Sequence, residues 1–200
     1  MLLLFFTNVQ AQQKVKGREL TRPEIMWSLA HPLAALKAKK CAEQVRCVVD
    51  SLERNKILTG SSGGQLDAFR HAYWMALMSM EMKPSKARKL GKAHEKGNYL
   101  QFTKGKLEDH ARPDSLSCEM DLKNNEAGIS IGTRLKTEKQ CSRQQIINTI
   151  LEEIRKGNLY VLKTNQQGQF LTCSGEVIDV KQYRDKWFIP KCLCKSNETN

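Results

Sequence analysis

The sequence contains no hydrophobic run of the roughly 20 residues that a transmembrane helix requires. It also contains no internal repeat and no low-complexity segment. What it does contain is ordinary for a globular protein, since 40% of its 200 residues are hydrophobic and 27% are charged. This length and composition predict one domain with a real core and a short appendage.

The sequence also lacks zinc-finger spacing, because its seven cysteines include no CxxC pair. Seven is an odd number, so at least one thiol stays unpaired unless a second chain joins it. We expect disulfides between the C-terminal segment and the helical body, together with a buried thiol or two, rather than a cysteine metal site or nucleophile. Disulfides are typical of an oxidising compartment.

Residues 1–11 look like a signal peptide. Residues 2–6 are an apolar run, and Val9, Gln10 and Ala11 place small residues where a signal peptidase cleaves. A basic start is missing and the segment is short. The apolar run and the cleavage-site residues nevertheless favour an exported protein, periplasmic or secreted, whose mature chain begins at Gln12.

The formal net charge of +12 favours anionic partners, such as a phospholipid, an acidic polymer or another anionic substrate or surface. Most lysines are scattered, which fits a generally basic surface equally well. The dense basic stretch at residues 83–92 has no interleaved aromatic residues on which bases could stack. Nucleic-acid binding is therefore not indicated.

Helical spacing of apolar residues covers most of the chain up to residue 157. We predict helices from about Thr21 to the His31-Pro32 break, from Pro32 to about Asn55, and over residues 67–82. A short helix through His94-Glu95 should close at Gly97-Asn98, before an irregular loop at 98–117. Further helices are expected at 118–135 and 142–157.

Beyond residue 157 the period falls to two, which is typical of strands. Residues 159–162 and 169–172 predict a β-hairpin, and residues 175–178 a third short strand. The predicted fold class is therefore mainly α, a single helical domain at 24–157 with a small C-terminal β-hairpin or short antiparallel sheet. The Cys-containing tail within 158–200 should pack on it.

Polar groups that are costly to bury interrupt three of the predicted helices. Asp67 and His71 are four residues apart and share a helix face, so the carboxylate can orient the imidazole ring, while Arg70 can bind an anion. Asp121 and Asn125 also share a face, which Gly128 and Gly132 continue; the glycines predict close packing against another helix.

These residues form the predicted site. The zinc signature HExxH is absent because residue 98 is asparagine. The predicted catalytic residues are His71, His94, Glu95 and Asp121, the substrate-binding residues Arg70 and Asn125, and the residues that orient them Asp67, His31 and Asn124. A divalent metal bound by His71, His94 and Asp121 fits these ligand types. A buried hydrogen-bond network that locks the helices together fits them too.

The same clusters resemble a bacterial domain family of unknown function that is often exported or appended to larger secreted proteins. The resemblance spans residues 24 to 165 and implies no established activity. It is carried by four motifs in order: His31-Pro32, Ala68-Phe69-Arg70-His71-Ala72, His94-Glu95, and Asp121-Leu122-Lys123-Asn124-Asn125-Glu126-Ala127-Gly128.

Two functional hypotheses follow. The first is a metal-assisted hydrolase of an anionic phosphodiester or phospholipid-like substrate, and the second is a non-catalytic exported binding or structural module or a toxin-associated domain. The hydrolase requires His71, His94 and Asp121 to converge within ligand distance beside an open cleft. The second hypothesis predicts the same side chains buried without access.

Export can be tested by intact-mass measurement of the protein purified from its native host. We expect a mass that corresponds to removal of residues 1–11. A cytoplasmic protein that retains Met1 would contradict the predicted signal peptide.

Overall fold

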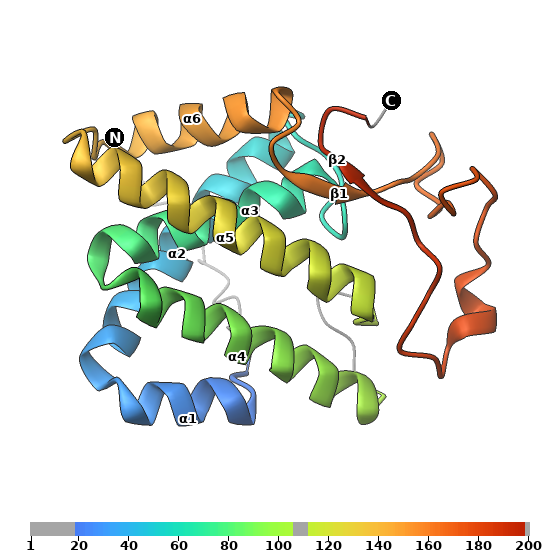
Figure 1. Ribbon diagram of the computed structural model, residues 1–200, viewed down its shortest axis with the longest axis horizontal. Coiled ribbons are helices and arrows are strands. Elements are labelled where there is room, and N and C mark those ends of the chain that lie inside the picture. The colour runs from blue at the N-terminus through green and yellow to red at the C-terminus, as the bar shows by residue number, and fades with distance from the viewer. Residues whose placement is uncertain (1–18, 106–111, 199–200) are drawn as a thin grey trace, which may run out of the picture.

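The computed structural model describes residues 19–105 and 112–198, and this part of the chain is mainly helical (Figure 1). The helices are α1 (Arg22–Ala30), α2 (Pro32–Arg54), α3 (Gln65–Glu81), α4 (Pro84–Thr103), α5 (Ser115–Thr137) and α6 (Arg143–Arg155). The helices are followed by a short antiparallel sheet of β1 (Tyr160–Leu162) and β2 (Leu193–Lys195). A 3-10 helix, η1 (Val180–Tyr183), lies before β2 in the chain. The predicted fold class is confirmed.

Local sequence signals account for the helix ends. The backbone N–H of Thr21 donates to Glu24 Oε2 at 2.7 Å in a capping box that opens α1. Pro32 starts α2 directly after His31, where α1 ends, because proline fits the first helical turn and cannot continue a preceding helix. Ser142 caps α6 in the same way as Thr21 caps α1.

Helix α3 is the centre of the domain and contacts α2, α4, α5, α6 and β1. Its side chains are buried on nearly every side, including Phe69, Tyr73 and Met75, which have no exposed surface. A helix that is apolar all round lies in a core rather than at a surface. Asp67 and His71 are therefore embedded in the least exposed element of the fold.

Helices α3 and α5 approach closely along a seam of small residues. A Cβ atom added to Gly128 would lie 2.2 Å from the carbonyl oxygen of Ala72, and one added to Gly132 would lie 2.3 Å from that of Ala76. Both contacts advance by four residues on each helix, so the two helices run in the same direction. The predicted close packing at Gly128 and Gly132 is confirmed.

The predicted end of α4 at Gly97-Asn98 is wrong, because this helix continues to Thr103. Consequently the predicted loop at 98–117 is shorter at both ends, and residues 106–111 lie outside the described part of the chain. Gly97 serves packing rather than termination, since a Cβ there would lie 2.2 Å from Oγ1 of Thr21. Glycine thus lets α1 begin directly against α4.

The C-terminal strands pair differently from the prediction. Strand β1 lies where expected, but it pairs with β2 in the register Val161 to Cys194 and not with residues 169–172. In the region of the predicted hairpin and third strand, the structure has only two isolated antiparallel bridges among the described residues, Thr164 with Phe170 and Leu171 with Val177. Residues 193–195 lack a long strand pattern, so their pairing depends on the tail folding back.

A disulfide joins Cys173 to Cys192. It links two parts of the C-terminal segment and not, as expected, that segment to the helical body. A buried thiol is present at Cys41, where burial and the nearby charge of Glu81 raise the pKa to about 11. At neutral pH this thiol is protonated and acts as a core side chain.

The predicted signal peptide, residues 1–11, lies outside the described residues. Among the helices of the described part, none is long and apolar enough to cross a membrane.

The α3–α5 seam yields a stability prediction. Gly128→Ala should raise intrinsic helix propensity by about 1 kcal/mol, yet we expect a net loss of about 1–3 kcal/mol because the new methyl meets the Ala72 backbone. The matched control is Ser130→Ala, which is exposed on α5 and should change the free energy of unfolding by less than about 0.5 kcal/mol. Urea denaturation measures both, and a stabilised Gly128→Ala protein would contradict the close packing.

Candidate functional site

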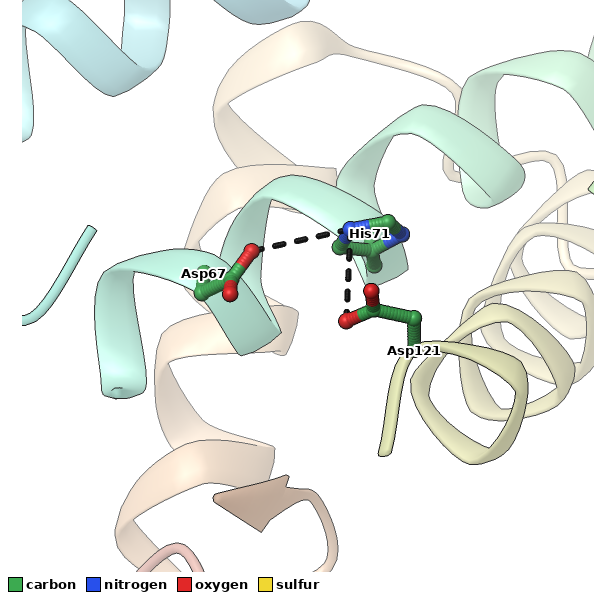
Figure 2. Close-up of side chains that lie close together, drawn as sticks. All are labelled: Asp67, His71 and Asp121. Atoms are coloured by element: carbon green, nitrogen blue, oxygen red, sulfur yellow. Dashed lines mark ion pairs between the residues drawn. The ribbon is translucent and has the colours of Figure 1, made fainter. Parts of the chain in front are cut away.

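The candidate site lies where α3, α4 and α5 meet, with one residue from α1. Helix α3 supplies Asp67 and His71, and α5 supplies Asp121. The nearest acceptor atoms of these three residues lie within 4.8 Å of one another, and all three residues are buried. In Figure 2 both carboxylates point toward the same ring nitrogen of His71.

The distances within this trio fit metal coordination as well as long hydrogen bonds. Nε2 of His71 lies 3.5 Å from Oδ1 of Asp67 and 3.3 Å from Oδ1 of Asp121. Good N–H···O bonds cluster near 2.9–3.0 Å. Ligand atoms about 2.0–2.1 Å from a tetrahedral ion lie roughly 3.3–3.4 Å apart. The trio therefore has the size and the donor types of a ligand set.

Asn125 sets the orientation of the His71 ring. Its Oδ1 lies 3.3 Å from Nδ1 of His71, on the side of the ring away from the carboxylates. When Nδ1 carries the ring proton, it donates to this amide oxygen. The other nitrogen, Nε2, is then available to a cation between Asp67 and Asp121.

Two interactions hold Asp67 in place at the start of α3. Its Oδ2 accepts from the backbone N–H of Gly63 at 2.6 Å, and its Oδ1 accepts from Arg70 at 2.5 Å. A carboxylate in the first turn also complements the helix dipole. Arg70 in turn lies 3.4 Å from Nε2 of His71, so its positive charge borders the trio.

A second histidine lies beside the first, with the rings of His71 and His94 6.0 Å apart. Glu24 of α1 contacts Nδ1 of His94 at 3.0 Å, and Glu95 lies 3.9 Å from its Nε2. Carboxylates thus flank both ring nitrogens. Trp74 packs edge-on against the same ring and limits its rotation.

The structure brings together most of the predicted residues but divides them into two groups. Asp67, expected to orient His71, belongs to the candidate ligand trio, whereas His94 belongs to a separate group with Glu24 and Glu95. Arg70 and Asn125, which were predicted from the sequence to bind substrate, lie beside the trio.

Two predicted residues lie elsewhere. The ring of His31 packs edge-on against Trp27 at the junction of α1 and α2. The side chain of Asn124 exchanges two 2.9 Å hydrogen bonds with the backbone of Tyr160 and so ties β1 to α5.

Sequence reasoning missed two residues of the site, Glu24 and Asn98. Glu24 reads as a helix-cap residue, and it does cap α1, but it is also buried against His94. Asn98 donates to Glu95 at 2.9 Å, a contact that exists only because α4 continues past Gly97. The burial of Glu24 is invisible in the sequence, since only packing of α1 on α4 creates it.

Access to the site is uneven. The side chain of His71 is 3% exposed, whereas that of His94 is 12% and that of Arg70 is 31% exposed. Arg70 and His94 therefore form the more accessible flank of a buried centre. Of the three residues that the hydrolase hypothesis requires to converge, His71 and Asp121 do so whereas His94 stays outside the trio, and the burial of His71 fits the alternative.

No curated protein and no solved structure matches the chain. One family model does match, over residues 25–158, and it describes a domain of unknown function, DUF6973. The match covers most of α1 and all of α2 to α6, and it contains the Asp67, His71 and Asp121 trio; Glu24 lies just before it. The chain therefore belongs to the family of this domain of unknown function, DUF6973.

Proposed function

We propose that the protein is a metal-assisted hydrolase of an anionic phosphodiester-type substrate, with a divalent ion bound by Asp67, His71 and Asp121. The observation that carries this proposal is the convergence of one imidazole nitrogen and two carboxylates within 4.8 Å. Two buried carboxylates this close to one another require positive charge nearby, and a divalent ion would supply it in addition to the single charge of Arg70.

A divalent ion in this site would supply Lewis-acid polarisation of a phosphoryl oxygen and activation of water. The guanidinium of Arg70 would hold a nonbridging phosphate oxygen by charge-assisted hydrogen bonds at the accessible flank. His94 would exchange a proton with the leaving group, and Glu24 would orient its ring from Nδ1. A basic protein with a net charge of +12 attracts such substrates.

The alternative function is a non-catalytic exported binding or structural module, and the 3% exposure of the His71 side chain favours it. In this case His71 is an imidazolium that satisfies Asp67, Asp121 and Asn125 and holds α3 to α5. No ion is then required.

We also propose export to an oxidising compartment. The apolar run at residues 2–6 and the Cys173–Cys192 disulfide support this location.

Metal binding discriminates the two functions. Protein stripped of metal should bind one equivalent of Zn²⁺ or Mn²⁺ in isothermal titration calorimetry, and its melting temperature should rise because an ion at 100 times Kd stabilises the folded state by roughly 2.7 kcal/mol. Asp121→Asn should weaken this binding at least about tenfold, since a neutral amide replaces a ligand carboxylate.

The matched control is Glu119→Gln, which removes an exposed carboxylate from the same helix. It should bind metal as the wild type does. Wild-type protein that binds neither ion, combined with an Asp121→Asn protein that melts at a lower temperature, would establish the hydrogen-bond network instead of the metal site.

Hydrolysis is the second test. With Zn²⁺ or Mn²⁺ added, wild-type protein should cleave bis(p-nitrophenyl) phosphate, and His94→Gln should lower kcat by about 10²–10⁴-fold while metal binding is retained, because a glutamine cannot transfer the proton. Lys96→Gln, an exposed change two residues along α4, is the control and should keep wild-type kcat. Metal binding without any hydrolysis would favour the non-catalytic module.

A further inference from the structure

The junction of α1 and α2 carries a cluster of large apolar side chains exposed to solvent, at an edge of the molecule (lower left in Figure 1). Leu29 is 71% and Leu33 is 78% exposed, although half of the leucines in the described residues are buried. Single exposed apolar residues are common, but a contiguous group marks an interaction surface. We call this group the corner patch; its members are Ile25, Met26, Leu29, Leu33 and Leu36.

The two helices present this patch with the same polarity. On α1 the exposed stripe at helical spacing is Arg22, Ile25, Met26 and Leu29, and on α2 it is Leu33, Leu36, Lys37 and Lys40. Both stripes place their apolar residues next to the junction. Both place their basic residues farther from it. The result is an apolar tip with cationic residues behind it on each side.

The surroundings of the patch are also basic. Glu24 contacts His94, and Thr21 packs on Gly97, so α1 and α4 run antiparallel and the end of α1 lies toward the start of α4. That half of α4 carries Lys86, Lys89 and Lys92. Glu24, which is buried, is the only acidic residue of α1, and Lys37 is paired with Glu81 of α3.

We propose that the corner patch docks the protein on an anionic lipid bilayer, with Leu29 and Leu33 in the acyl region and Arg22 and Lys40 at the phosphate headgroups. A bilayer interface takes up exposed leucines while it attracts nearby lysines and arginines, and each contributes to binding. The patch lies on a helix junction at an edge of the molecule (Figure 1), and a fluid bilayer can take up such an edge. A symmetric second copy would bring like charges together, which opposes pairing of two such patches.

This inference goes beyond the proposed hydrolase because it concerns exposed residues of α1 and α2, not the buried Glu24, and needs no metal. It remains valid if the site is only a structural network. If the proposed phosphodiesterase activity is also present, the docked protein would act next to lipid headgroups.

The test is vesicle co-sedimentation. It uses the mature protein, whose first residue is known from the intact-mass measurement. Wild-type protein should bind vesicles of phosphatidylglycerol and phosphatidylcholine in equal parts, and should bind pure phosphatidylcholine much more weakly. Leu29→Ser combined with Leu33→Ser should lower the partition coefficient at least about tenfold, because two buried leucine side chains are lost. Arg22→Gln combined with Lys40→Gln should lower it by roughly fivefold per charge.

Matched controls separate docking from general stickiness and from net charge. Ile57→Ser with Val177→Ser removes two other exposed apolar residues, and Lys181→Gln with Lys186→Gln removes two other exposed charges. Both control proteins should bind as the wild type does.

The proposal is overturned if wild-type protein does not bind the anionic vesicles, or if the double serine variant of Leu29 and Leu33 binds them as well as wild type. It is also overturned if wild-type protein is a dimer by light scattering that this variant converts to a monomer, since the patch would then be an interface between two copies. Circular dichroism of each variant confirms that a loss of binding does not reflect unfolding.

Discussion

The candidate site depends on the close approach of α3 and α5. Gly128 and Gly132 lack side chains where the backbones of Ala72 and Ala76 pass, so the two parallel helices meet almost backbone to backbone. The same register places His71, the residue before Ala72, against Asn125 and Asp121, about one and two turns before Gly128. A larger side chain in the seam would separate the helices and draw the two carboxylates away from the imidazole. The seam therefore sets the geometry of the trio.

Burial of charge is the main cost of this arrangement. Asp67, Asp121, Glu24 and Glu95 are all buried around two histidines and one arginine, and unpaired buried charges are strongly destabilising. The surrounding apolar side chains of α3 lower the local dielectric, which strengthens every charge interaction in the site. A protein keeps such a group when the charges bind something or when they lock helices in register, and metal binding decides between these two roles.

The flanks of the domain have different tasks. Residues after 157 fold back so that β2 pairs with β1, and Asn124 joins β1 to α5 beside the site. On the other side, α1 contributes Glu24 to the His94 group from its buried face and carries part of the corner patch on its exposed face. One nine-residue helix thus links the buried centre to the surface that we propose for lipid docking.

The sequence alone was sufficient for the mainly helical class and for the breaks at His31-Pro32 and Gly64, because helical periodicity and capping are local properties. For the same reason it was sufficient to place Asp67 and His71 on one helix face and Asp121 and Asn125 on another. It could not predict that α4 passes through Gly97, since that glycine is needed for contact with Thr21, or that β1 pairs with residues 193–195 and Cys173 with Cys192. Nor could it show that Asp67 joins the candidate ligand trio while His94 lies outside it, or that Glu24 is buried against His94. These features depend on which helices touch and in which register, and residues distant in the chain acquire their distances only when the seam between α3 and α5 closes.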